Sequence, residues 1–153
     1  MTDLIDAVRR KSYDDVASLI EAAELDLNDK FGMAALHYAV KLGMSDIVKL
    51  LLDAGSNINI TNNSNETPLH LTCYKKRLTG IAKMLLDAGA DTEVRSKMCG
   101  STVLHFAAAG GHNGIVKLLL DAGADKEAEN NYEDTPVSLA IEFKHYDTLD
   151  LLK

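Results

Sequence analysis

The sequence predicts an all-α solenoid of about five stacked helix-turn-helix units joined by hairpin-like loops. Two repeated phrases carry this prediction. The phrase LLDAG occurs at 51–55, 85–89 and 119–123, so that successive copies start 34 residues apart. A second phrase precedes each copy and occurs a fourth time, as AALHYA (34–39), TPLHLT (67–72), TVLHFA (102–107) and TPVSLA (135–140). Two phrases that keep one common period of this length indicate stacked structural repeats.

Each unit has the local signals of two helices. In the third unit, Thr67 can cap a first helix and Pro68 suits the first helical position, where no N–H is needed. The segment LHLTC (69–73) then forms a short first helix, and IAKMLLDA (81–88) has the apolar spacing of a second helix. Gly89 stands where a left-handed helix C-terminus is expected. The fourth unit's second helix has an apolar face too wide for one unit to bury, so neighbouring units must stack.

The period divides the chain into a single domain of five units. We expect an N-terminal capping repeat at 1–29, in which LIDAV and VASLIEAA stand for the two helices. Further repeats follow at 30–61, 62–96 and 97–129, and a C-terminal capping repeat at 130–153. The last unit stops at LDLLK, before the glycine and the outgoing loop. A natural end and a trimmed boundary are both compatible with this.

Composition restricts the class of protein. A chain of 153 residues with 46% hydrophobic content can bury a continuous core. Its 16 Lys and Arg against 23 Asp and Glu disfavour non-specific binding to nucleic acid or anionic membranes, which needs a cationic surface. The N-terminus lacks the apolar segment of a signal peptide. With only Cys73 and Cys99 and no CxxC motif, we expect an intracellular, cytoplasmic protein.

The repeats resemble those of the ankyrin-repeat family. The resemblance rests on the TPLH-type phrases, on GGHNGIVKLLLDAGAD (110–125) and on the loop glycines Gly32 and Gly100, and it covers nearly the whole chain. It implies a non-catalytic protein–protein interaction module, a monomer that presents a rigid concave groove to a partner protein. An inhibitory regulator of an enzyme such as a kinase remains an alternative. A fragment of a larger scaffold, adaptor or effector protein is another.

No residue pattern points to catalysis, a cofactor or a metal. His37, His70 and His105 share one position of the repeated phrase, where the resemblance implies a structural hydrogen-bonding role. His112 and His145 share another position, after the turn between helices. A zinc site needs three or four convergent ligands, and no set has that spacing. GGHNG (110–114) lacks the Lys-Ser/Thr pair and the preceding strand of a phosphate-binding loop. We therefore expect no enzymatic activity and no cofactor.

The resemblance places partner-binding residues just before each repeated phrase and at the end of each first helix. Four of the aromatic residues, of which the chain has only five Tyr and three Phe, fall at these positions. Large apolar residues where packing does not require them favour a protein-binding surface. The residues concerned are Lys30, Phe31, Met33, Lys41, Leu42, Asn63, Ser64, Glu66, Tyr74, Lys75, Met98, Ser101, Asn131, Tyr132, Asp134, Glu142 and Phe143.

The third unit carries an irregular basic turn, CYKKRLTG (73–80). From Thr67 to Gly89 it is one residue longer than the matching segments of its neighbours, and the following loop, SKMCGS (96–101), carries another extra residue. The usual glycine of the turn is missing, which predicts an altered turn. Lys76 and Arg77 could offer a positive spot to an acidic partner, or could simply be solvated.

Overall fold

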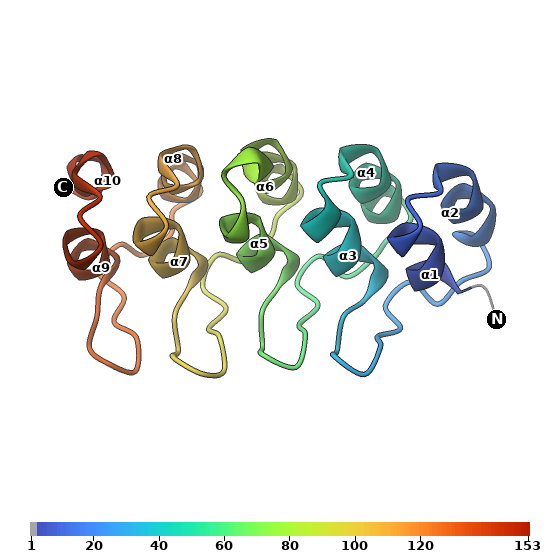
Figure 1. The fold of residues 1–153 in the computed structure, drawn as a ribbon, viewed down its shortest axis with the longest axis horizontal. Coiled ribbons are helices and arrows are strands. Elements are labelled where there is room, and N and C mark those ends of the chain that lie inside the picture. Colours follow the sequence, from blue (N-terminus) through green and yellow to red (C-terminus); the bar gives the residue numbers. More distant parts are fainter. Residues whose placement is uncertain (1–2) are drawn as a thin grey trace.

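The computed structural model describes residues 3–153, which fold into five helix-turn-helix units stacked in a single row, with the termini at opposite ends (Figure 1). This confirms the predicted all-α solenoid. Apart from an isolated bridge between Asn28 and Ala34, these residues contain no β-structure. The helices of the five units are, in order, α1 (Leu4–Arg9) and α2 (Tyr13–Leu19), α3 (Ala35–Leu42) and α4 (Ser45–Asp53), α5 (Pro68–Leu71) and α6 (Thr79–Asp87), α7 (Val103–Ala109) and α8 (Asn113–Asp121), and α9 (Pro136–Glu142) and α10 (Tyr146–Leu152).

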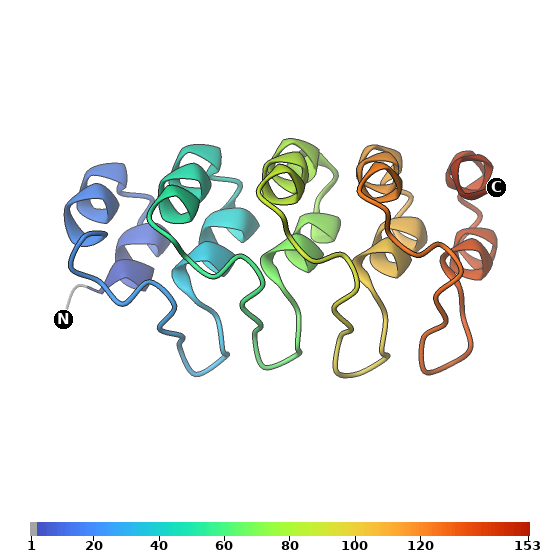
Figure 2. The same ribbon diagram turned by 180° about the vertical axis from the view of Figure 1, so that it is seen from behind.

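The helices form two layers, and the loops extend from one of them. The first helices of the units lie beside one another, the second helices form a parallel row, and the hairpin-like loops project together past the first helices (Figure 2). Contacts run along both rows, for example between α3 and α5 and between α6 and α8. Leu36, Leu51, Leu69, Leu104 and Leu119 are among the side chains buried there. Across residues 3–153, every helix is too short or too polar to cross a bilayer.

Three buried histidines connect the start of a first helix to its surroundings. Nδ1 of His37 accepts a hydrogen bond from the Ala34 backbone N–H at 3.1 Å, and the neutral ring therefore carries its proton on Nε2. That nitrogen donates to the Glu66 carbonyl of the next unit, at 3.1 Å. His105 makes the same pair of contacts, and its Nε2 lies 2.9 Å from the Asp134 carbonyl. The rings of His37 and His105 thus each join two neighbouring units.

His70 makes only half of this arrangement. Its Nδ1 accepts from the Thr67 N–H at 3.1 Å, but its buried Nε2 has no hydrogen-bond partner among the described residues. The loop that should supply the partner is the longer one: its closing bond runs from the Ser96 N–H to the Ser101 carbonyl, five residues on. In the other three loops the closing bond spans four residues, as from Asn62 to Glu66. The extra residue predicted near SKMCGS therefore lies within this hairpin.

The basic turn of the third unit differs from the turns of the other units. Those turns contain a residue with positive φ, namely Lys11, Gly43, Gly111 or Lys144. The third unit instead has two short 3-10 turns, η1 (Thr72–Tyr74) and η2 (Lys76–Leu78), on either side of Lys75, whose φ is −146°. The predicted alteration of this turn is confirmed.

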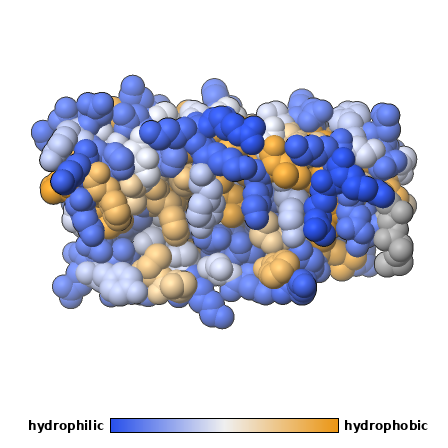
Figure 3. Space-filling view, viewed as in Figure 1, coloured by the Kyte–Doolittle hydropathy of each residue, from blue (hydrophilic) through white to orange (hydrophobic). Residues whose placement is uncertain are grey.

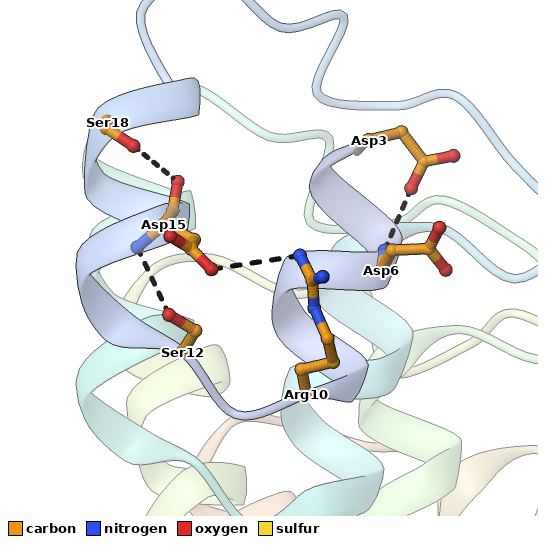
Figure 4. A network of polar contacts seen from close by, with 6 residues as sticks. All are labelled: Asp3, Asp6, Arg10, Ser12, Asp15 and Ser18. Carbon is orange, nitrogen blue, oxygen red and sulfur yellow. Dashed lines mark hydrogen bonds and ion pairs between the residues drawn. The ribbon is translucent and has the colours of Figure 1, made fainter. Parts of the chain in front are cut away.

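The first unit holds its two helices with polar groups (Figure 4). Asp3 Oδ1 accepts from the Asp6 N–H at 2.8 Å and caps α1, while Ser12 Oγ accepts from the Asp15 N–H at 3.3 Å and caps α2. An ion pair of 3.7 Å joins Arg10 to Asp15 across the two helices. Because both side chains are exposed, that pair contributes at most about 1 kcal/mol.

Two of the three LLDAG aspartates have a similar local role. Asp53 pairs with Lys49 at 2.8 Å, and Asp87 pairs with Lys83 at 2.6 Å, one helical turn apart in each case. These are exposed pairs on the second helices. Such pairs typically add a few tenths of a kcal/mol, about 0.2–0.5, to a helix.

The buried histidines predict a loss of stability in mild acid. Burial lowers the pKa values of His37, His70 and His105 below that of a free imidazole. Below about pH 6.5 the unfolded chain therefore binds more protons than the folded chain, so the stability present above this pH is lost as the pH falls. The free energy of unfolding in urea should drop between about pH 7.5 and about pH 5.5, by up to about 1.4 kcal/mol per pH unit for each histidine. Replacing His37 with Gln should reduce this slope by about a quarter, because burial lowers the pKa of His112 as well. A flat profile over this range would contradict the expectation.

The unequal contacts of the histidines give a second prediction. His105→Ala removes the helix-start bond and the bond to the next unit, whereas His70→Ala removes only the first. Urea unfolding at neutral pH should show His105→Ala to be more destabilising, by about 1 kcal/mol, the net contribution of one hydrogen bond. If both variants lose the same free energy of unfolding, or if His70→Ala loses more, the missing hydrogen bond of His70 does not affect stability.

Candidate protein-binding face

The tips of the hairpins are shaped by side chains that accept backbone hydrogen bonds. Asp29 Oδ1 accepts from the N–H groups of Phe31 and Met33, at 2.9 and 3.0 Å. Burial acts to raise the pKa of Asp29, but hydrogen bonds from the Tyr38 hydroxyl and these two N–H groups lower it overall. Asn62 and Asn130 hold the next and the last hairpin in the same way. The tip conformation is therefore encoded locally, and short polar side chains of this type favour such turns.

Adjacent hairpins are also bonded to one another. The Asn63 N–H donates to the Phe31 carbonyl at 3.1 Å, the Lys97 N–H to the Ser64 carbonyl at 2.8 Å, and the Asn131 N–H to the Cys99 carbonyl at 2.9 Å. The guanidinium of Arg95 adds bonds to the carbonyls of Gly100 and Glu129. The tips are consequently held at fixed positions along the row.

Gly32 shows how closely these hairpins approach. Its φ is +73°, and a Cβ added there would lie 2.6 Å from the backbone nitrogen of Asn63 in the next hairpin. A side chain at this position would therefore be strained by its own backbone and would collide with its neighbour. The close approach of the two hairpins therefore explains why a glycine stands at position 32, one of the loop glycines on which the family resemblance rests.

Large apolar side chains are exposed on the surface formed by the hairpin tips and the ends of the first helices, here called the hairpin face. Figure 3 shows hydrophobic residues there in separate groups divided by hydrophilic ones. The exposed fractions are 58% for Phe31, 59% for Tyr74, 90% for Met98, 69% for Tyr132 and 52% for Phe143. Aromatic residues and methionine are enriched at protein–protein interfaces, so this row of exposed side chains favours a protein-binding surface.

Tyr74 is exposed and yet held in place. Its hydroxyl donates to Glu66 Oε1 at 2.6 Å, and its ring centroid lies 6.4 Å from that of Phe106. Burial of the hydroxyl and its bond to Glu66 raise the pKa of Tyr74. The ring therefore offers a rigid apolar surface that costs little entropy to bury.

A hollow of about 380 Å³ lies beside Tyr74, between the second and third units. Its volume is near the lower end of the range of about 300–1,000 Å³ that is typical of ligand sites. Met33, Leu71, Leu78 and the Tyr74 ring supply its apolar walls. The polar groups of its lining are Lys41, Asn62, Glu66 and Lys75.

The structure brings five of the residues predicted from the sequence together at this hollow. They are Met33, Lys41, Glu66, Tyr74 and Lys75. Most of the predicted residues are exposed along the row, and Leu42, Glu66 and Asp134 are half-buried. The exposed ones are Lys30, Phe31, Lys41, Asn63, Ser64, Tyr74, Lys75, Met98, Asn131, Tyr132, Glu142 and Phe143.

Two of the predicted residues are buried, and the expectation that they are exposed is wrong. Met33 is 7% exposed, and its sulfur lies 3.6 Å from the amide nitrogen of Asn62 in the next hairpin. Ser101 is 5% exposed, and its hydroxyl oxygen accepts a hydrogen bond from the Asn130 amide at 3.2 Å. The cause is the same in both cases: at this position the side chain contacts the asparagine that shapes the following hairpin.

Sequence reasoning missed three residues of the hollow, Asn62, Leu71 and Leu78. A signal for Leu78 was present, because it occupies the position directly before the second helix that Met44 and His112 occupy in the neighbouring units. Leu78 is only 2% exposed, and its side chain lies against Gly43 of the preceding unit. Aligning these helix starts would have placed it at the boundary between the second and third units.

The two cysteine thiols have different environments. Burial raises the pKa of Cys73 to about 12, so its thiol is protonated at neutral pH. Burial also acts to raise the pKa of Cys99, but hydrogen bonds from Ser101 and Ser96 lower it overall. Within the described chain, 3–153, no three His, Cys, Asp or Glu side chains are grouped as metal ligands would be.

The comparison with protein families decides the classification. A family model of ankyrin repeats, in three copies, matches residues 4–96 and 77–153. The chain belongs to the ankyrin-repeat family. Ankyrin repeats generally act as non-enzymatic modules that bind other proteins.

Several curated ankyrin-repeat relatives match part of the chain. An ankyrin repeat protein of fowlpox virus is 42% identical over 71 residues, which are 44% of this chain and 10% of the relative. The Neurogenic locus Notch protein of Drosophila melanogaster is 43% identical over 53 residues, 34% of this chain and 2% of the relative. Protein phosphatase 1 regulatory subunit 27 of Mus musculus is 35% identical over 71 residues, 45% of this chain and 46% of the relative. The chain spans less than half the length of each of these relatives.

Proposed function

We propose that this chain is a non-catalytic module that binds a partner protein on its hairpin face. The observation that carries the proposal is the row of exposed apolar side chains, Phe31, Tyr74, Met98, Tyr132 and Phe143, on hairpins and helix ends that are bonded to one another. Aromatic anchors commonly contribute about 2 kcal/mol or more each at an interface. These side chains serve no purpose in the core, and a partner could bury them.

The fixed geometry of the face supports this function. The hydrogen bonds along the hairpin tips order the backbone before a partner arrives, so this side of the interface loses little conformational entropy on binding. The net charge of −7 favours a protein partner with complementary basic groups over nucleic acid or an anionic membrane. We propose that the module acts as a monomer in the cytoplasm.

A second function is favoured by one relative. The mouse protein with 35% identity is named as a regulatory subunit of a phosphatase. By analogy, the partner of this chain would be an enzyme, such as a kinase or a phosphatase, whose activity changes when the hairpin face binds it. A third possibility is that the chain is the interaction part of a larger scaffold, adaptor or effector protein. The fowlpox and Drosophila relatives support it, because the chain matches only a small share of their length.

Affinity capture from a cell lysate tests the proposed face. The double variant Phe31→Ala/Tyr74→Ala should lose the partner that the unchanged chain retains, because the loss of two anchors weakens binding by about a hundredfold or more. The matched control is Tyr13→Ala/Tyr146→Ala, which removes two exposed aromatic rings from the second helices. Far-ultraviolet circular dichroism checks that both variants fold.

The control variant should recover the same protein as the unchanged chain. Equal recovery by the two double variants would show that the hairpin face is not the binding surface. Addition of the purified partner to its own activity assay then separates an enzyme regulator from a passive scaffold.

A further inference from the structure

A cluster of cations stands beside the hollow in an otherwise acidic chain. Lys41 lies in the last turn of α3 in the second unit, and Lys75, Lys76 and Arg77 belong to the irregular turn of the third. All four are exposed, and none has a carboxylate within 4.0 Å among residues 3–153. The Lys75 ammonium donates to the Lys41 carbonyl at 3.4 Å, so the two units contribute to one positive surface.

The single acidic group in the hollow is already engaged. Glu66 accepts from the Tyr74 hydroxyl at 2.6 Å through Oε1 and from the Asn62 amide at 3.2 Å through Oε2. One carboxylate held by two neutral donors stands against four cations here, so the net local charge remains positive. An arriving carboxylate would therefore find unpaired cations at the edge of the hollow.

The walls of the hollow suit an apolar side chain rather than a charged group. Met33 and the Leu71 and Leu78 side chains are buried, and the Tyr74 ring closes one side. A volume of about 380 Å³ leaves room for one bulky side chain, and transfer of an aliphatic side chain from water to such walls is favourable.

We propose that this hollow binds a short acidic peptide segment of the partner protein, with one aliphatic side chain inserted between the second and third units. Carboxylates next to that side chain pair with Lys41 and Lys75, and Lys76 and Arg77 attract the segment from solution. The proposal rests on the proposed function and names the chemistry of the partner at this part of the hairpin face.

A peptide fits these groups better than a nucleic acid or a lipid headgroup. The positive surface is confined to four side chains on a chain with a net charge of −7, so an extended polyanion would meet acidic residues beyond it. An aliphatic side chain with a carboxylate on either side matches both the apolar walls and the local charge. The extra length of the basic turn thus gives the third unit a binding site that regular repeats lack.

Defined peptides test the proposal by nuclear magnetic resonance titration of the ¹⁵N-labelled chain. The probes are three short synthetic peptides in a Gly-Ser background: Leu between Glu residues, Ala between Glu residues, and Leu between Lys residues. Only the first should bind, with a Kd of about 1 mM or tighter, and it should shift the amide signals of residues 33–42 and 71–79. The other two should bind at least about tenfold more weakly.

Charge reversal identifies the cations. Lys41→Glu/Lys75→Glu should weaken binding of the first peptide by about tenfold or more. Lys97→Glu/Lys117→Glu changes the net charge equally at exposed positions away from the hollow, and should leave the affinity within about twofold. Raising the salt concentration from about 0.05 M to about 0.5 M should weaken binding to the unchanged chain and have little effect on the double variant.

Four results would overturn the proposal: no binding of the first peptide at about 1 mM, equal binding of the acidic and basic Leu peptides, equal effects of the two charge reversals, or shifts at other parts of the chain. This failure is distinguishable from failure of the proposed function. The lysate capture by the hairpin face makes no assumption about the charge of the partner, and it can succeed when every peptide fails.

Discussion

No helix pair in this chain can bury its own apolar face, and the rest of the structure depends on the contact that each pair makes with the next. The Glu66 backbone carbonyl shows how this contact is extended from the core to the surface. It accepts from His37 of the preceding unit at 3.1 Å and from the Asn62 N–H that closes its own hairpin at 3.0 Å. The side chain of the same residue accepts from Tyr74. One residue therefore links helix stacking, hairpin shape and the position of an exposed aromatic ring.

The third unit is the exception in this regular arrangement, and the hollow is built there. Its first helix is shortened to α5 and continues as two 3-10 turns, which bring Tyr74, Lys75 and Leu78 to the boundary with the second unit. At the next boundary, where the hairpin carries an extra residue of its own, the buried His70 Nε2 has no hydrogen-bond partner among residues 3–153. Unsatisfied buried polar groups typically cost about 1–3 kcal/mol.

Much of the fold could be predicted from the sequence, because two phrases that keep one common period directly indicate stacked units. The extra residues of the third unit and of the following loop were also visible, since they change the spacing of those phrases. The errors arose where a residue's environment is set by the neighbouring unit. Met33 and Ser101 stand just before the repeated phrase, where exposure was expected, but they contact asparagines of the next hairpin. Leu78 was missed because its contact with Gly43 spans two units. The repeat period therefore predicts the structure within one unit, but it does not predict which side chains contact the neighbouring unit.

The central claim is that the ordered hairpin face, and not the row of second helices, meets the partner. Hydrogen–deuterium exchange of the chain, alone and saturated with the protein it captures, tests this most directly. We expect slower exchange at the hairpin tips and at the ends of α3, η1, α7 and α9, and unchanged exchange in α4, α6 and α8. Protection concentrated on the second helices, with the hairpins unaffected, would contradict the account.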